Sequence, residues 1–200
     1  MTAHDQINIL KAALGEGSAP SSDFDLNPDV VLPAGRKLRP AGVLAAFQVG
    51  SQGLDLILTK RSSRLKHHPG QIAFPGGKVD EGDADVVAAA LREADEEIGL
   101  HPNNVEVLGK LPGHETVTGF DVTPVIGLVK ANFDPVPEPG EVDEVFTVPF
   151  THIANSDLFS VQYRRWQGRR RHYYTVPFGP YYIWGATARI LRGLADRIVE

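Results

Sequence analysis

The chain has no cysteine among its 200 residues. Disulfides, thiolate zinc sites and a cysteine nucleophile are therefore excluded, and any bound metal must be held by oxygen or imidazole ligands. No apolar run of 18 residues is present, and the first residues lack the basic segment and apolar core of a signal peptide. The formal net charge of −5 disfavours general nucleic-acid binding. We therefore expect a cytoplasmic protein with neither a membrane nor a nucleic-acid partner.

The composition is that of a folded globular protein, with 42% hydrophobic residues and mixed charges. Two hundred residues suffice for one domain with its own core. Apolar residues at near-helical spacing predict a short helix over residues 5–14, followed by a connector rich in Gly, Ser, Pro and Asp. We expect residues 1–37 to form this N-terminal helix and connector, without an assigned function, and residues 38–200 to form one domain.

Several β-capable runs follow in irregular order. Residues 41–49 and 54–61 flank a short glycine-containing turn and predict a hairpin, and residues 158–166 and 169–178 flank Gln167-Gly168 and predict a second one. Further strands are expected at 105–113, 122–131 and 145–150, a helix at 184–198, and an acidic, proline-rich surface loop at 132–144. Such a mixture predicts an α/β (α+β) sandwich in which helices flank a mixed β-sheet.

The most regular helix is predicted over residues 84–98. Asp83 is placed to act as its N-cap, and Gly99 is placed to end it in a left-handed conformation. One apolar stripe runs along the helix at the spacing of a buried face. The stripe consists of Val87, Ala90, Leu91, Ala94 and Ile98.

Three carboxylates gather beside that stripe. Glu93 and Glu97 lie one turn apart on the same face, and Glu96 is adjacent to Glu97. Like charges repel one another, and the C-terminal half of a helix disfavours anions, so helix stability does not explain this cluster. A divalent cation would relieve the repulsion, and oxygen ligands suit Mg²⁺ or Mn²⁺. The alternative is a solvated acidic face.

Residues 77–100 resemble the Nudix box, Gly-x5-Glu-x7-Arg-Glu-U-x-Glu-Glu-x-Gly-U, where U is a bulky apolar residue. Ala94 fills the first U position with a small side chain. Asp83 stands where the pattern has its first Glu, and eight residues, not seven, separate it from Arg92. The remaining matches are Arg92, Glu93, Glu96, Glu97, Gly99 and Leu100.

The variant box and the segment before it are similar to one subgroup, the coenzyme A pyrophosphatase-like Nudix hydrolases. Residues 58–77 resemble the upstream LTxRS…L…HxGxxxFPGG pattern of that subgroup. The runs TGFDVTPVIG and YYIWGATARIL also resemble it, so the similarity covers residues 38 to 195. The upstream matches are Leu58, Thr59, Arg61, Ser62, Leu65, His68, Gly70, Phe74, Pro75, Gly76 and Gly77.

This resemblance implies a Nudix-like fold and an Mg²⁺- or Mn²⁺-dependent pyrophosphohydrolase. The implied reaction cleaves coenzyme A or a derivative to 3′,5′-ADP and 4′-phosphopantetheine or its acylated form. By the same resemblance, Glu93 and Glu97 are the main metal ligands, with Glu96 at a second ion or at the attacking water. A backbone carbonyl of the glycine pair, that of Gly77 in particular, is a further ligand. Arg92 is expected to orient a box carboxylate, so Arg92, Glu93 and Glu96 are the implied catalytic residues.

The base and the substrate contacts follow from the same comparison. Glu141 and Glu144, in the acidic loop, are candidates for a general base, against the alternative of a solvated loop. A basic loop before the box suits a substrate with several phosphates. Its His68 has an alternative role as a loop histidine bonded to backbone. The predicted substrate-binding residues are Arg61, Arg64, His68 and Phe74.

Two later clusters keep two interpretations each. The arginines at 164–165 and 169–171 are either a solvated strand edge that discourages pairing with other chains or a phosphate clamp. Trp184 and the pair Tyr181-Tyr182 are either core aromatics or a stacking platform for a base.

Other functions compete with coenzyme A hydrolysis. The substrate could be ADP-ribose, a dinucleoside polyphosphate or a damaged nucleotide, since the box is shared by all of them. A non-catalytic Nudix-fold module that binds a nucleotide is the alternative from a different class, although the retained carboxylates disfavour it. The sequence does not fix the oligomeric state, and a homodimer is kept as one alternative.

Overall fold

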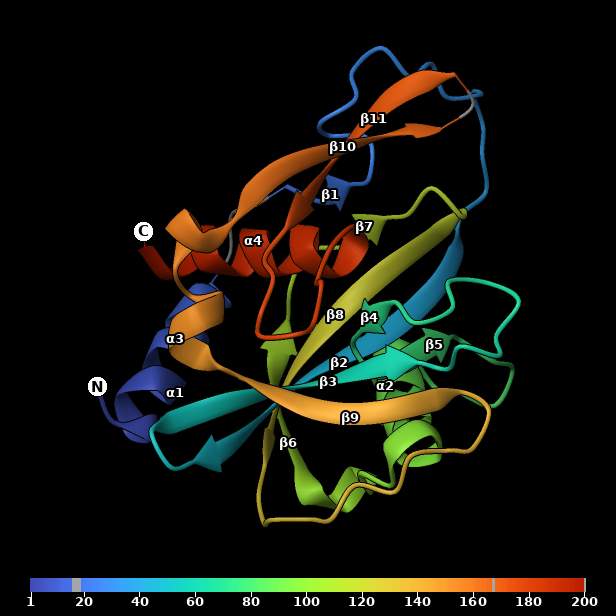
Figure 1. The fold of residues 1–200 in the computed structure, drawn as a ribbon. Helices are drawn as coiled ribbons and strands as arrows, with labels where there is room; N and C mark the ends of the chain where they lie inside the picture. Colours follow the sequence, from blue (N-terminus) through green and yellow to red (C-terminus); the bar gives the residue numbers. More distant parts are fainter. Residues whose placement is uncertain (16–18, 167, 200) are drawn as a thin grey trace.

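The computed structural model of the chain describes residues 1–15, 19–166 and 168–199. A mixed sheet of nine strands forms its centre in this described part, with the order β1-β7-β8-β2-β3-β4. Strand β5 pairs with β2, β6 with β8 and β9 with β3. The arrangement confirms the predicted mixed sheet flanked by helices (Figure 1). The strands are β1 Ser21–Ser22, β2 Arg39–Gly50, β3 Gly53–Arg61, β4 Ile72–Ala73, β5 Gly76–Lys78, β6 Val105–Lys110, β7 His114–Glu115, β8 Phe120–Val129 and β9 Val142–Pro149.

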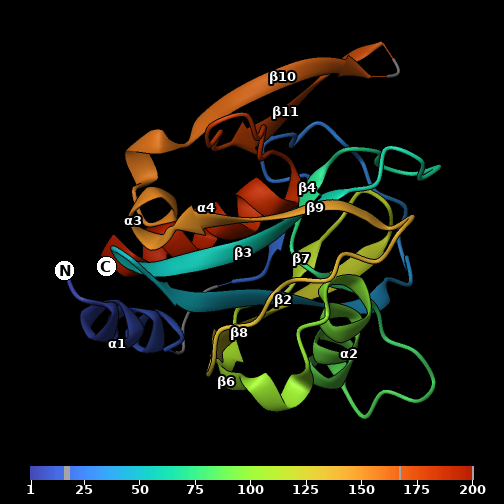
Figure 2. The ribbon, with the colours of Figure 1, turned by 60° about the horizontal axis from the view of Figure 1, so that its bottom comes forward.

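Helices cover both faces of this sheet. Figure 2 shows α2 (Val86–Ile98) on one side and α4 (Ala186–Val199) on the other. Successive residues of β2 point to opposite faces, so Leu44 packs in the core beneath α2 while Phe47 packs in the core shared with α4. Burial on both faces explains why β2 and β3 read as continuous apolar runs, and not as alternating ones. The shorter helices are α1 Ala3–Ala13 and α3 Phe150–Ile153, with single turns at Pro102–Asn104 and Ser156–Leu158.

The start of α2 differs from the prediction. Asp85, not Asp83, is the N-cap, and its carboxylate accepts the backbone N–H groups of Val87 and Ala88, both at 2.9 Å. Asp83 was wrongly assigned because Arg92 holds its carboxylate, which leaves the capping position to the next acidic residue. The other end is as expected, since Gly99 ends the helix with φ 71°.

The described parts of the N-terminal segment, residues 1–15 and 19–37, contact the rest of the molecule at several points. Leu10 of α1 is fully buried in the core shared with α4. In the connector, β1 pairs in parallel with β7. The side chain of Asn27 donates to the carbonyl of His172 at 2.9 Å and accepts from its N–H at 2.8 Å. The connector is thereby fastened at two points to segments far away in the sequence.

The segments after α2 follow the prediction with two changes. Strand β9 begins at Val142, so Glu144 lies in a strand and not in the expected loop, because it pairs with Lys60 of β3. Strands β10 (Ser160–Trp166) and β11 (Arg169–Thr175) form the predicted second hairpin as a separate two-stranded sheet, and Gln167 lies outside the described residues. Helix α4 starts at Ala186, two residues later than predicted. Among the described residues, no helix has the length and apolarity needed to cross a membrane.

Candidate active site

Glu97 is the most deeply placed carboxylate of α2. Only 5% of the residue is exposed, and its Oε2 accepts the backbone N–H of Gly76 at 3.1 Å. Burial raises the pKa of Glu97 to about 7, while the Gly76 hydrogen bond and the nearby Arg61 act in the opposite direction. A carboxylate whose charge is this poorly compensated by the protein suits a cation-binding role.

The two glycines before the helix are required for different reasons. A Cβ on Gly77 would lie 2.4 Å from the carboxyl carbon of Glu93, so only glycine lets that carboxylate approach the strand. Gly76 has φ 151°, and a Cβ there would meet the carbonyl oxygen of Gly42 at 2.5 Å. Burial raises the pKa of Glu93, and Arg92 partly offsets this effect. The glycine pair therefore brings the backbone of β5 directly against the carboxylates of α2.

Arg92 connects the acidic groups around the helix. Its guanidinium donates to both carboxylate oxygens of Asp83 at 2.9 Å, to Glu93 at 3.1 Å and to Glu96 at 2.9 Å. The hydrogen bonds from Arg92 lower the pKa of Asp83 to about 2. The structure thus shows the expected pairing of Arg92 with box carboxylates. It also gives the variant acid at position 83 a role, which is to anchor Arg92.

The cluster can be tested for its fit to a metal ion. Among the residues that the structure describes, no group of three or more His, Asp or Glu side chains stands in a metal-binding arrangement, and Arg92 engages both Glu93 and Glu96. The donor chemistry nevertheless fits a divalent cation, because three carboxylates and a closely approaching backbone supply only hard oxygen atoms. The metal-binding roles of Glu93, Glu96, Glu97 and Gly77 stay predictions.

The two candidates for a general base differ in their surroundings. Glu141 is exposed, and its charge contributes to the raised pKa values of both Glu93 and Glu97. Glu144 is engaged elsewhere, because its carboxylate accepts the hydroxyl of Tyr181 at 2.5 Å. Of the two residues, Glu141 is therefore the stronger candidate. Its charge acts on Glu93 and Glu97, whereas the carboxylate of Glu144 is bonded to Tyr181.

A cavity of about 260 Å³ lies between the β10–β11 hairpin, the start of α4 and the segment leading to β5. Three of the four predicted substrate-binding residues line it, namely Arg61, His68 and Phe74, and Gly76 lines it as well. Arg64 is exposed and does not line the cavity, because the turn at Ser62 directs it to solvent. His68 has φ 54°, and its carbonyl accepts the N–H of Gln71 at 3.3 Å.

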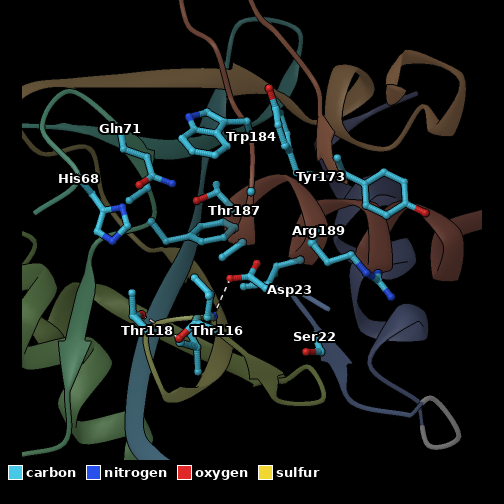
Figure 3. A pocket seen from close by; sticks show the side chains of 18 of the residues that line it. Ser22, Asp23, His68, Gln71, Thr116, Thr118, Tyr173, Trp184, Thr187 and Arg189 are labelled. Atoms are coloured by element: carbon cyan, nitrogen blue, oxygen red, sulfur yellow. Dashed lines mark hydrogen bonds between the residues drawn. The ribbon is translucent and has the colours of Figure 1, made fainter. Parts of the chain in front are cut away.

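Several lining residues were not predicted. Figure 3 shows Asp23, Thr116, Thr118, Gln71 and Thr187 around the hollow, and they come from separate segments of the chain. The carboxylate of Asp23 accepts the N–H of Val117 at 2.9 Å and lies 3.3 Å from Nε2 of the fully buried His114. Burial opposes the ionisation of Asp23, but these hydrogen bonds prevail and lower its pKa. No motif marks Asp23, which lies in the connector that had no functional interpretation.

The aromatic residues near the C-terminus divide between two environments. Tyr181 stacks on Phe146 with ring centroids 3.5 Å apart, beside the core. Tyr182 is 47% exposed, so the interpretation as a core residue is wrong for it. Trp184 lines the cavity (Figure 3). The guanidinium of Arg164 lies 4.7 Å from the centroid of its ring.

Comparisons with known proteins show the family and agree with the fold. A family model described as NUDIX domain matches residues 38–169. The chain is 40% identical over 171 residues to "Uncharacterized Nudix hydrolase NudL" of Citrobacter koseri, covering 84% of this chain and 81% of that protein. A protein of the same name from Escherichia coli (strain SMS-3-5 / SECEC) is 43% identical over 146 residues, covering 72% of this chain and 74% of that protein. In fold, the chain is similar to a MutT/nudix family protein from Enterococcus faecalis, with a TM-score of 0.52 and 17% identity. The similarity covers 88% of this chain and 68% of that protein.

Proposed function

The chain belongs to the NUDIX domain family, and from that premise we propose that it cleaves the diphosphate of coenzyme A or a derivative. The products would be 3′,5′-ADP and 4′-phosphopantetheine or its acylated form. As a Nudix hydrolase, the protein acts on a pyrophosphate bond, and the coenzyme A-like substrate is the further step that we add.

One observation carries the choice of substrate. The upstream motif that resembles the coenzyme A pyrophosphatase-like subgroup contributes Arg61, His68 and Phe74 to the walls of one cavity. The cavity extends to Gly76, whose N–H is hydrogen-bonded to Glu97. A substrate held by the motif residues would therefore present its diphosphate to the carboxylates of α2.

The residues around α2 support hydrolysis of that bond. Nudix hydrolases generally use divalent ions, and we propose that Glu93, Glu96, Glu97 and the carbonyl of Gly77 hold Mg²⁺ or Mn²⁺ here. Such an ion supplies neutralisation of the diphosphate charge and acidification of a water molecule. Arg92 orients Glu93 and Glu96 from one side while Asp83 fixes its guanidinium from the other. The glycine pair lets the carboxylate of Glu93 lie directly against the backbone of β5.

We assign the proton-accepting role to Glu141. It lies in an exposed position, and its carboxylate is near enough to influence Glu93 and Glu97. Glu144 is bonded to Tyr181 and is the weaker candidate. A base on a loop outside the helix would leave the helix carboxylates for the cation.

The proposed substrate also has consequences for the cellular location and the partners of the protein. Coenzyme A derivatives are made and consumed inside cells, so the proposal implies a cytoplasmic location and a small-molecule partner. The homodimer stays a separate expectation that sedimentation analysis would test.

The test is direct hydrolysis. The purified protein with Mg²⁺ or Mn²⁺ should convert coenzyme A to 3′,5′-ADP, resolved by chromatography, and chelation of the metal should abolish the product. In a panel that includes ADP-ribose and a dinucleoside polyphosphate, coenzyme A or a derivative should have the highest kcat/KM. Absence of 3′,5′-ADP above background would reject the proposed substrate, and a higher kcat/KM for another substrate would replace it.

A further inference from the structure

Two arginines face each other directly across the β10–β11 hairpin. Arg164 and Arg171 are register partners on the antiparallel strands, and both line the cavity. Like charges directly opposite each other destabilise a strand pair. The stability of the hairpin therefore does not account for their position, and this pair differs from the other arginines of the hairpin in lining a cavity.

The other arginines of the hairpin are placed differently. Arg165 and Arg170 are also register partners and are exposed, as Arg164 is, but neither of them lines the cavity. Arg170 lies over the ring of Tyr163, 4.8 Å from its centroid. The cluster thus contains both of the predicted arrangements, a solvated edge at Arg165 and Arg170 and a pair directed at the cavity.

The charges around the cavity do not balance. Its lining contains four arginines and one carboxylate, that of Asp23, which lies 3.6 Å from Arg171. Arg189 is paired with Asp25 at 2.8 Å. Within residues 1–15, 19–166 and 168–199, no carboxylate lies within 4 Å of a guanidinium nitrogen of Arg164. A positively charged cavity in a chain with a net charge of −5 is suited to an anionic ligand. The arginines are Arg61, Arg164, Arg171 and Arg189.

The position of Arg164 and Arg171 relative to the carboxylates of α2 limits which part of a substrate can supply the bound anion. The cavity reaches Gly76 and hence the carboxylates of α2, while Arg164 lies over Trp184 on the wall formed with the hairpin. A volume of about 260 Å³ is small beside the roughly 300–1,000 Å³ of pockets that enclose whole drug-sized ligands. The cavity therefore suits one part of a nucleotide, with the reacting diphosphate left at its edge.

We propose that Arg164 and Arg171 form a subsite for a phosphate monoester that the substrate carries in addition to its diphosphate. Guanidinium groups bind phosphate through paired, charge-assisted hydrogen bonds. Asp23 is a positioning residue, because its carboxylate forms an ion pair with Arg171. That carboxylate is fixed in turn by its contacts with the N–H of Val117 and with Nε2 of His114. The inference rests on the proposed function and adds to it the residues that discriminate between substrates with and without this phosphate.

The test compares coenzyme A with 3′-dephospho-coenzyme A, which lacks only the extra phosphate. The wild-type protein with Mn²⁺ should have the higher kcat/KM on coenzyme A. Arg164→Gln should lower that value by about 10- to 100-fold, through KM, and leave the value for the dephosphorylated substrate within about twofold. Arg171→Gln should act in the same direction, and Arg165→Gln, on the other set of arginines, should leave both substrates unchanged. The subsite would be overturned if Arg164→Gln lowered kcat/KM equally for both substrates. It would also be overturned if Arg165→Gln lowered kcat/KM for coenzyme A as much as Arg164→Gln does.

A binding measurement separates this inference from the proposed reaction. By calorimetry without metal, the wild-type protein should bind adenosine 3′,5′-bisphosphate more tightly than adenosine 5′-monophosphate, and Arg164→Gln should remove the difference. If coenzyme A is not hydrolysed but this preference is found and lost in the variant, the subsite stands and the proposed reaction falls. If coenzyme A is hydrolysed and no preference exists, the reaction stands and the subsite is rejected.

Discussion

Under the proposed function, helix α2 and the cavity that reaches Gly76 are two halves of one site, and their charges are opposite. The carboxylates of α2 come from little more than one turn of one helix, and burial raises the pKa values of Glu93 and Glu97. The cavity collects side chains from the connector, β3, the hairpin and α4, and its charged residues are mainly arginines. Under the proposed function, cleavage and the selection of substrate therefore have separate structural origins in this molecule. Mutations in each half should accordingly have different kinetic signatures.

The largest effect is expected from Glu97→Gln. Loss of a buried carboxylate that we assign to the metal should lower kcat by about 1000-fold, equivalent to about 4 kcal/mol. Binding of 3′,5′-ADP in the cavity, measured by calorimetry, should stay within about twofold because the cavity arginines are untouched. The effect would thus be confined to the catalytic half.

Asp95→Asn is the matched control, because it also replaces a carboxylate of α2 by an amide. The guanidinium of Arg92 bonds to Asp83, Glu93 and Glu96, so the change at Asp95 leaves these bonds in place. It should keep kcat within about threefold of the wild type. If Glu97→Gln retained wild-type kcat, or if it weakened nucleotide binding as strongly as catalysis, the separation into two halves would be wrong.

Gly77→Ala should have an intermediate effect. The added methyl group would lie 2.4 Å from the carboxyl carbon of Glu93 and must displace it. A shift of about 1 Å in a catalytic group can cost about 100-fold in rate, and we expect a fall in kcat of that size. Gly82→Ala is the control, because a methyl group on Gly82 would have open space within 4 Å, and its kcat should be unchanged. Equal rates for the two variants would show that the close approach of Glu93 to β5 is not needed.

The smallest effect is expected from Asp83→Asn, and it depends on pH. The pKa of Asp83 falls from 3.8 to about 2 on folding, so its ion pair with Arg92 stabilises the folded state fully above about pH 4 and is lost as the pH falls through 2. The variant should therefore melt about 2 to 4 °C below the wild type at pH 6, a difference that shrinks as the pH is lowered toward 2. Circular dichroism melts at several pH values measure it.

Asp134→Asn provides the reference for that series, since Asp134 is an exposed loop residue. Its melting temperature should follow that of the wild type at each pH. A difference between Asp83→Asn and the wild type that stayed constant from pH 6 to pH 2.5 would mean that the anchor of Arg92 is not electrostatic.

Much of the fold was accessible from the sequence, because its elements carry local signals. The first hairpin, helix α2 with its apolar stripe and the terminator Gly99 are found where periodicity and turn residues predicted them. The errors at Asp83 and Glu144 have one cause. In each case a partner distant in the sequence, Arg92 or a residue of β3, decided the local structure over the local signal.

The sequence alone was enough to place Glu93, Glu96 and Glu97 together, since helix geometry fixes how residues three and four apart are placed. It could not establish the cavity. Asp23, Thr116 and Arg171 meet there only because β1 pairs with β7 and the hairpin folds over the sheet, and neither pairing has a signature in local composition. Contacts between residues far apart along the chain depend on the packing of the whole domain. The tertiary structure therefore decided which arginines line the cavity and which do not.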